Sequence, residues 1–569
     1  MKSRLILRAR ILSVIFILVA VLLIARLYFV QVVHGGEYAE RATGQYVESA
    51  PDTEDRGDIV FTTKGGAPLA AAVMQTGARV AIEPDAIGEP EALYDALNEI
   101  TPVDRARFFA SAAKKGDPYE EVAFRVESEA AKAIRAKKLP GVMVVQDQWR
   151  FYPAGTLAAQ TVGFVGYKGD KKIGVYGLER FWQSTLARTS SGLYVNPFAE
   201  IFTSIESALS DPAQQSGNVI TSIEPDVQLE LEKTLADVLE DYSSKLAGGI
   251  VMDPQTGEIV AMAVRPTFDP NTYNTVEDAS VFSNPLVESV YEMGSIMKPL
   301  TMAAGIDSGA VTPQTTYEDR GCIERSGKRI CNYDGKARGV VSMQEVLNQS
   351  LNTGVTFVAE RMGRNVFREY VHSFGLGEKT GIDLPNEAAG IIDSIDDGYD
   401  VDIASASFGQ GIAVSAVEMT RALSALGNGG VPPPPHVATA IKLESGIVRE
   451  LPVEQGARVL KEESARQVTE MLVKVFDNAL LGGVLKQERY SIAAKTGTAQ
   501  IAIPGGGGYY KDRYLHSFFG YFPAYEPRFI VFLFTLEPRG AEFASATLAR
   551  PFLDIAKYLI NYYDIPPDR

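Results

Sequence analysis

The chain has 569 residues and a formal net charge of −16 at pH 7, and it is 46% hydrophobic and 22% charged, as in an ordinary globular protein. These proportions exclude a disordered tail, a collagen-like fibre and a polytopic transporter, and the acidic balance argues against a nucleic-acid partner. Because the four histidines are scattered and there are only two cysteines, we expect no metal site.

The N-terminus predicts a membrane anchor. After a basic tail of residues 1–10, an apolar run begins at Ile11, is interrupted by Arg26 and continues to Val33. As a helix, residues 11–33 would be about 34 Å long, enough to cross a bilayer core. The basic tail favours a cytoplasmic N-terminus, so the rest of the chain would lie outside the cytoplasm. A cleaved signal peptide is the alternative, but no clean small-residue cleavage site follows the run, so we favour an uncleaved anchor.

The part after the anchor divides by composition into two domains. Residues 34–55 are polar and contain several glycines, which predicts a stalk. A first domain is predicted over residues 56–203, a small and polar linker over 204–217, and a second domain over 218–569.

The first domain mixes strand and helix signals. Val80–Ile82 and Gly141–Val145 are strand-like. Glu127–Lys138 is rich in alanine and charge, which predicts a helix, and Pro140 and Gly141 follow it as stop signals.

The second domain has strands at both ends and helices between them. Val227–Tyr242 has helical spacing of leucine and valine, and Gly248–Val264 predicts a hairpin around the turn Asp253–Gly257. Phe529–Leu536 predicts a further strand, and Ala546–Tyr562 a final helix. This order is typical of an α+β domain.

The first motif that could carry chemistry is Ser-x-x-Lys at Ser295 and Lys298. Because Pro299 is tolerated only in a first helical turn, Ser295 is predicted at the N-terminus of a helix, where Lys298 shares its face. With no plausible histidine partner, the base for a serine nucleophile must be a lysine kept neutral by burial, by a second cation and by the helix end. The same helix end would stabilise an oxyanion. A second copy, Ser111–Lys114, is interpreted as a solvated helix end without function.

The second motif is Ser-x-Asn at Ser350 and Asn352. The hydroxyl could relay a proton to a leaving amine, and the amide could bind a peptide carbonyl. Taken alone, the pattern is better explained as helix capping. Another copy, Ser216–Asn218, falls at the linker and is interpreted as structural.

The third motif is Lys495-Thr496-Gly497-Thr498, inside an apolar strand signal. A strand edge can pair with an extended peptide, and a glycine allows the substrate to approach closely. The hydroxyls of Thr496 and Thr498 could bind a carboxylate, and Lys495 supplies positive charge. The copy Lys379–Gly381 lies between turn signals and is interpreted as a structural loop.

Together and in this order, the motifs resemble those of the penicillin-binding and serine β-lactamase superfamily. The rest of the chain narrows the resemblance to class B, monofunctional penicillin-binding proteins, most similar to the cell-division type. The segments that carry it are Arg56–Ile59 with Gly65–Ala70, Arg150–Gly166, Gly174–Trp182, Asn218–Gln228, Phe408–Gly430 and Phe518–Val531. The resemblance implies an elongated mixed α/β pedestal domain, of the dimerisation type, and a transpeptidase domain with a central antiparallel sheet flanked by helices.

The resemblance also implies roles. Ser295 would be the acylated nucleophile, Lys298 its base, and Ser350 and Asn352 would assist proton transfer and substrate binding. Lys495, Thr496 and Thr498 would hold the terminal carboxylate, Gly497 would lie against the substrate, and the backbone N–H groups of Ser295 and Thr498 would form the oxyanion hole.

The implied substrates are a D-Ala-D-Ala donor stem peptide and an acceptor amine, with β-lactams as mimics of the donor and no cofactor. The implied partners are a polytopic membrane glycosyltransferase and other cell-wall synthesis proteins. The implied location is the cytoplasmic (inner) membrane, with a single membrane pass. Four alternatives stay open: an elongation enzyme, a β-lactam sensor, a non-catalytic scaffold and a secreted β-lactamase.

Cys322 and Cys331 lie between the first two motifs. Outside the cytoplasm they could form a disulfide that closes a surface loop, or they could remain free thiols. Their spacing leaves both possibilities open.

Overall fold

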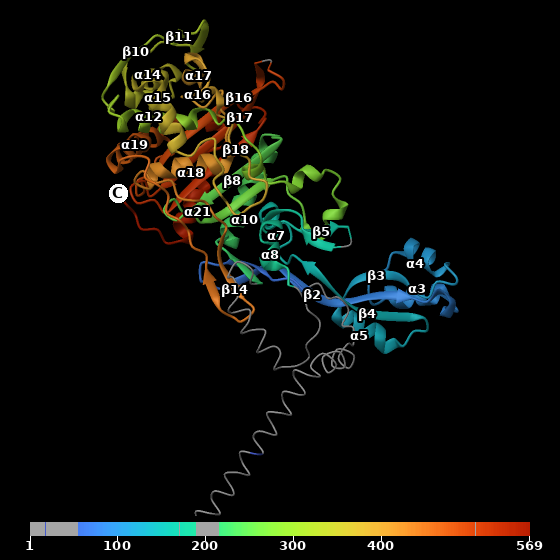
Figure 1. The fold of residues 1–569 in the computed structure, drawn as a ribbon. Coiled ribbons are helices and arrows are strands. Elements are labelled where there is room, and N and C mark those ends of the chain that lie inside the picture. Colours follow the sequence, from blue (N-terminus) through green and yellow to red (C-terminus); the bar gives the residue numbers. More distant parts are fainter. Residues whose placement is uncertain (1–17, 19–54, 170, 189–215, 507) are drawn as a thin grey trace, which may run out of the picture. The chain divides into compact units, whose positions relative to one another are not determined.

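The computed structural model describes residue 18 and residues 55–169, 171–188, 216–506 and 508–569 (Figure 1). The expected tail and nearly all of the expected anchor, stalk and linker lie outside these residues. Within the described ranges, no helix has both the length and the apolar character needed to span a bilayer.

The described chain forms two compact units. Of the described residues from 55 onward, the small unit holds 55, 77–148 and 188, and the large unit holds those in 56–76, 149–187 and 216–569. The range of 56–203 expected for the first domain is therefore divided. Its middle forms the small unit, whereas residues 56–76 and 149–187 belong to the large unit. In the first of these two pieces, for example, residues 59–60 pair with residues 219–220 of the large unit.

The small unit is built on three strands. The C-terminal half of β2 (Pro68–Ile82) pairs antiparallel with β3 (Glu120–Glu127), and β2 also pairs with β4 (Val142–Phe151). Apolar side chains from these strands and from the helices form its core. The helices are η2 (Pro84–Ala86), α3 (Pro90–Asn98), α4 (Arg105–Ala112) and α5 (Ser128–Lys137). The predicted helix over Glu127–Lys138 is thus confirmed as α5, and Lys138 ends it in a left-handed conformation with φ 45°.

The large unit contains a five-stranded antiparallel sheet in the order β16-β17-β18-β8-β9. The predicted hairpin is confirmed as β8 (Leu246–Met252) and β9 (Ile259–Arg265), and the strand Phe529–Leu536 as β18. The other two strands are β16 (Ala493–Ala502) and β17 (Tyr509–Phe522). The N-terminal strands and the C-terminal strands therefore share one sheet, which confirms the α+β class.

Both faces of this sheet are buried. Alternate side chains of β18, such as Phe532 and Val531, belong to different apolar clusters, as expected for a strand whose side chains point to opposite faces. One face packs against α10 (Pro225–Asp241) and α21 (Ala549–Tyr562) (Figure 1). The other face packs against α18 (Ala416–Gly427) and α19 (Glu462–Lys474), with the short helix η6 (Gly294–Met297) against β16. Helix α12 (Lys298–Asp307) contacts all three of these helices.

The remaining elements of the large unit lie around this core. A second group of strands runs in the order β15-β14-β7-β1-β2, with β1 (Ile59–Thr62), β7 (Gly217–Thr221), β14 (Ala438–Leu443) and β15 (Val448–Glu450). The short strands are β5 (Val165–Lys168), β6 (Lys171–Gly174), β10 (Thr316–Asp319), β11 (Cys322–Arg325), β12 (Lys328–Cys331) and β13 (Gly339–Ser342). The other helices are α6 (Ala159–Val162), α7 (Gly177–Phe181), α8 (Gln183–Leu186), η4 (Pro270–Thr275), η5 (Ala279–Phe282), α11 (Pro285–Glu288), α13 (Met343–Asn348), α14 (Asn352–Met362), α15 (Arg364–Ser373), α16 (Asp393–Asp396), α17 (Asp400–Ala406), η7 (Val475–Ala479), η8 (Leu480–Gly483) and α20 (Ala544–Thr547).

Three segments that carry the family resemblance meet at a buried carboxylate in the large unit. Glu179 is fully buried, and its oxygens accept hydrogen bonds from Arg56 Nε at 2.5 Å and from Arg150 Nε at 2.6 Å. Burial by itself raises the pKa of Glu179, but the two arginines outweigh burial and lower it. The ionised carboxylate therefore joins three segments that are distant in the sequence.

Candidate active site

The predicted nucleophile lies where two helices meet. Ser295 is the second residue of η6, and α12 follows directly, with Pro299 in its first turn, as the sequence predicted. Ser295 is half-buried, whereas Lys298 is fully buried. Within the described part of the chain, Ser295 Oγ makes no hydrogen bond to Lys298 Nζ, which contacts the second motif instead. Catalytic hydrogen bonds are often longer in a free enzyme than in its substrate complex.

A close packing of glycines sets the position of Ser295. Gly294 has φ +65°, and a Cβ placed on it would lie 3.1 Å from the carbonyl carbon and oxygen of Thr498. A Cβ on Gly409 would lie 2.2 Å from Gly294 O, and one on Gly497 would lie 2.3 Å from Ser517 Oγ. We call Gly294, Gly409 and Gly497 the glycine seam. It brings the backbone of the first motif into contact with that of the third.

Ser350 is the meeting point of two lysines. Its Oγ accepts hydrogen bonds from Lys298 Nζ at 3.1 Å and from Lys495 Nζ at 3.0 Å. Lys298 Nζ also donates to the Ser350 backbone carbonyl. This geometry depends on a left-handed backbone at Ser350, with φ 54°, which is uncommon for a residue other than glycine and directs its groups toward Lys298. The structure thus brings together one residue from each motif.

The two lysines lose their usual basicity here. Burial, and then the positive charge of Lys495, lower the pKa of Lys298 well below its ordinary value. Burial lowers the pKa of Lys495 to about 7. Burial and a second cation are two of the three influences that the sequence interpretation named, the third being the helix end. A neutral lysine is therefore available in the cluster to accept a proton.

Asn352 is the first residue of α14 and is half-buried. Its Nδ2 donates to the carbonyl oxygen of Cys331 at 2.8 Å. An amide nitrogen carries two hydrogens, so the second can serve a substrate carbonyl. No sequence pattern indicated the Cys331 contact, because it joins residues of two separate segments.

The third motif lies on the edge strand of the five-stranded sheet. Thr496 and Thr498 alternate with buried residues on β16, so both side chains face the same partly open side. Thr498 Oγ1 accepts a hydrogen bond from the backbone N–H of Ala544 at 3.1 Å. Because β16 ends the strand order, its outer edge can pair with an extended peptide.

The other motif copies make local structural contacts. Ser111 Oγ and Lys114 Nζ both bind the Glu120 carboxylate, at 2.8 and 2.6 Å. In the loop copy, Thr380 N and Oγ1 each donate to Glu387 Oε1 at 2.6 Å. These contacts support their interpretation as structural.

The structure contains the disulfide that the sequence analysis could not decide. Cys322 and Cys331 are direct cross-strand partners in the hairpin β11–β12, and their sulfurs are bonded. The bond closes the hairpin that also provides the carbonyl partner of Asn352.

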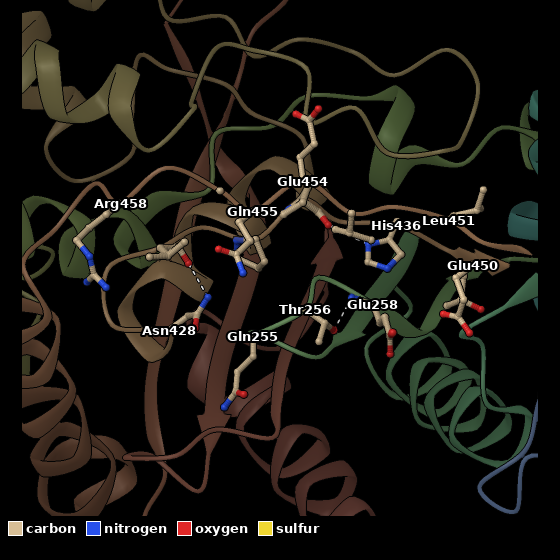
Figure 2. A pocket seen from close by; sticks show the side chains of 16 residues that line it. Gln255, Thr256, Glu258, Asn428, His436, Glu450, Leu451, Glu454, Gln455 and Arg458 are labelled. Atoms are coloured by element: carbon tan, nitrogen blue, oxygen red, sulfur yellow. Dashed lines mark hydrogen bonds between the residues drawn. The ribbon is translucent and has the colours of Figure 1, made fainter. Parts of the chain in front are cut away.

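A pocket of about 570 Å³ lies elsewhere in the large unit (Figure 2). Its lining includes Glu258, His436, Glu450 and Glu454. No residue of the three motifs lines it. The pocket is therefore separate from the three motifs.

Comparisons with known proteins identify the family. Residues 247–556 match the family model described as penicillin binding protein transpeptidase domain, and residues 52–201 match the penicillin-binding protein dimerisation domain. The chain belongs to the class B penicillin-binding proteins. The transpeptidase match includes all three motifs, and the dimerisation match covers nearly the range expected for the pedestal domain.

Three relatives illustrate the similarity. The chain is 29% identical to Stage V sporulation protein D of Bacillus subtilis, over 96% of this chain and 84% of that protein. It is 24% identical to the peptidoglycan D,D-transpeptidase FtsI of Buchnera aphidicola, over 98% and 95%. A crystal structure of penicillin binding protein 3 from Mycobacterium tuberculosis in complex with aztreonam superposes with a TM-score of 0.69 at 25% identity, over 91% of this chain and 98% of that chain.

Proposed function

We propose that this protein is a serine D,D-transpeptidase that crosslinks peptidoglycan stem peptides and is acylated by β-lactams. The observation that carries the proposal is Lys298, which lies three residues after Ser295 and is fully buried. Its pKa is lowered, and its Nζ lies 3.1 Å from Ser350 Oγ. The matched transpeptidase domain and the relative named as a D,D-transpeptidase support it.

In the first step, Ser295 Oγ attacks the carbonyl carbon of the penultimate D-Ala of the donor. Neutral Lys298 takes the hydroxyl proton, and Ser350 passes a proton to the nitrogen of the leaving D-Ala. The peptide bond breaks as the serine ester forms. Ser350 can act as this relay because its hydroxyl contacts both lysines.

The negative charge that develops on the carbonyl oxygen needs donors. The backbone N–H groups of Ser295 and Thr498 would supply them, and the glycine seam supports this role because it holds the two segments in contact. The terminal carboxylate of the donor would bind Thr496, Thr498 and Lys495. Its arrival favours the charged form of Lys495, whose pKa of about 7 leaves it able to gain a proton.

In the second step, the amine of an acceptor stem peptide attacks the ester carbonyl. A new amide bond forms, the ester bond breaks and the proton of the amine returns to Ser295 Oγ. A β-lactam completes only the first step, because its opened ring stays attached to the acyl group and no leaving fragment departs.

We assign the enzyme to septal wall synthesis, with residues 11–33 as its anchor in the cytoplasmic membrane and its catalytic domain outside the cytoplasm. The sequence of the first 33 residues, the resemblance to the cell-division type and the names of the relatives support this assignment. A polytopic glycosyltransferase would be the partner that supplies glycan strands.

The test is incubation of the full-length protein with a labelled penicillin, followed by peptide mass spectrometry, with Ser295→Ala as the control. We expect a label on Ser295 that is absent from the variant and decays slowly. Rapid loss with release of penicilloate would instead indicate a β-lactamase. No label on the folded wild-type protein would refute the proposed acyl-enzyme chemistry.

A further inference from the structure

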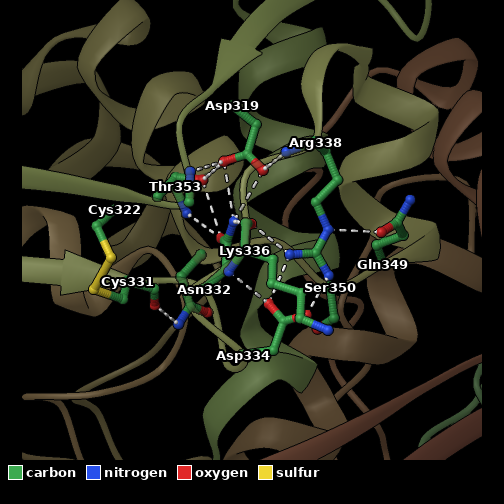
Figure 3. Close-up of polar contacts among 12 residues, drawn as sticks. Asp319, Cys322, Cys331, Asn332, Asp334, Lys336, Arg338, Gln349, Ser350 and Thr353 are labelled. Atoms are coloured by element: carbon green, nitrogen blue, oxygen red, sulfur yellow. Dashed lines mark hydrogen bonds and ion pairs between the residues drawn. A yellow bond between two sulfur atoms is a disulfide. The ribbon is translucent and has the colours of Figure 1, made fainter.

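A buried polar network surrounds the start of α14, next to the second motif (Figure 3). Its centre is Thr353, the residue that follows Asn352. The Thr353 hydroxyl lies 2.8 Å from Asp319 Oδ1 and 3.0 Å from Asn332 Oδ1, and the Thr353 backbone N–H donates to Asn332 Oδ1 at 3.2 Å. The exposed fractions of Asp319, Asn332 and Thr353 are 1%, 3% and 2%, so water does not compete for these bonds.

Asp319 and Asn332 lie on either side of the disulfide-closed hairpin. Asp319 ends β10, just before Cys322, and Asn332 follows Cys331. The Asn332 amide nitrogen donates to both Asp319 oxygens, at 3.0 and 3.1 Å. The two ends of the hairpin segment are therefore held together by hydrogen bonds as well as by the disulfide.

The same segment orients Asn352. The Cys331 carbonyl accepts the Asn352 Nδ2–H at 2.8 Å, which fixes which way the amide faces. Cys331 adjoins Asn332, and Asn352 adjoins Thr353. The hydrogen bond from Asn352 to Cys331 and the Thr353 network therefore connect the same two segments of the chain. Loss of the network would let α14 shift relative to the Cys331 carbonyl.

We propose that Asp319 and Asn332 are positioning residues that hold Asn352, through Thr353 and the Cys331 carbonyl, in the orientation that binds the amide carbonyl of the donor's acyl side. This rests on the proposed function and on the second Nδ2 hydrogen of Asn352, which would donate to that carbonyl. Neither Asp319 nor Asn332 needs to touch the substrate. The network thus makes the hairpin a determinant of which acyl groups the enzyme accepts.

Two penicillins test this role. Benzylpenicillin carries an acylamido carbonyl beside its β-lactam ring, and 6-aminopenicillanic acid has a free amine in its place. Thr353→Val keeps the shape of the side chain but removes the hydroxyl that Asp319 and Asn332 bind. We expect it to slow acylation by benzylpenicillin about tenfold, the effect of one lost buried hydrogen bond to a charged group, and acylation by 6-aminopenicillanic acid by less than about threefold.

The controls separate positioning from stability. Thr380→Val removes a comparable buried threonine–carboxylate hydrogen bond in the loop copy of the third motif, so we expect the same small loss of thermal stability and no change in the ratio of the two rates. Thr353→Ser restores the hydroxyl and should restore the ratio. Asn332→Ala should reproduce the selective loss.

The measurement is the second-order acylation rate constant of the full-length protein with each compound, in competition with a fluorescent penicillin. An equal reduction for both compounds in Thr353→Val, or no reduction for either, would overturn the positioning role. A wild-type protein that neither compound acylates would instead refute the proposed function itself.

Discussion

Replacement of Lys495 by methionine should make the protein more stable, and the gain should depend on pH. In the unfolded chain a lysine keeps its proton up to about its ordinary pKa of 10.5, whereas burial lowers the pKa of folded Lys495 to about 7. Between these values the unfolded chain binds more protons than the folded one, so the free energy of unfolding rises with pH. Methionine has a similar length and no charge to bury.

The size of the effect follows from the two pKa values. At about 1.4 kcal/mol for each factor of ten, the deprotonation of Lys495 lowers the free energy of unfolding by about 4 kcal/mol at pH 7 and by about 2 kcal/mol at pH 9. The stability advantage of Lys495→Met should therefore shrink by about 2 kcal/mol between these pH values. The variant also relieves Lys298 of a neighbouring charge, which acts in the same direction.

The assay is urea unfolding of wild type and variant at pH 7, 8 and 9. Lys474→Met, at an exposed position of α19, is the control and should show a difference from wild type that does not vary with pH. An advantage of Lys495→Met that stays constant with pH would refute the reasoning, since it would mean that folded Lys495 keeps its proton. Penicillin labelling should fall in Lys495→Met, because the variant lacks the positive charge that binds the carboxylate of the penicillin. Active-site residues commonly lower the stability of a protein while serving its function.

Three further predictions concern the site and the cluster around Glu179. Gly497→Ala should cost about 1–3 kcal/mol and slow penicillin labelling, because its Cβ would lie 2.6 Å from Met293 O; unchanged thermal unfolding and labelling would contradict the close packing. Arg150→Ala should cost about 3–5 kcal/mol in urea unfolding, because it removes one of the two arginines that hold buried Glu179, and a cost below about 1 kcal/mol would be inconsistent with that role. The acylation rate should rise as pH increases through the lowered pKa of Lys298, because only the neutral amine accepts a proton, and a flat pH profile would exclude it as the base.

The local elements of the catalytic domain could be predicted from the sequence. The hairpin of β8 and β9 follows from two apolar runs around a turn, and α10 from its helical spacing, because both depend on neighbouring residues. The position of Ser295 before α12 follows from Pro299 alone.

The contacts between motifs could not be predicted in this way. Lys298 and Lys495 both bind the Ser350 hydroxyl. This contact depends on the left-handed backbone of Ser350 and on strands that are paired across the whole domain. Order and resemblance indicated which copies of each motif matter, but no pattern indicated that Asn352 binds Cys331 or that Gly409 packs on Gly294. These are tertiary contacts between residues far apart in the chain.

The division into units also escaped prediction. Arg56, Arg150 and Glu179 fall within the range expected for the first domain, yet they belong to the large unit, because they bind one another in its interior. A boundary drawn along the sequence cannot represent a chain that leaves a unit and returns to it.

The glycine seam restricts how this protein can evolve under antibiotic selection. A Cβ on Gly409 or Gly497 would lie within 2.6 Å of a backbone oxygen, and Gly294 has a positive φ, so substitutions there would shift the nucleophile segment relative to its strand and slow acylation by substrate and drug alike. We then expect resistance to arise from other side chains near the three motifs, where a change can alter drug binding and leave the backbone contacts intact.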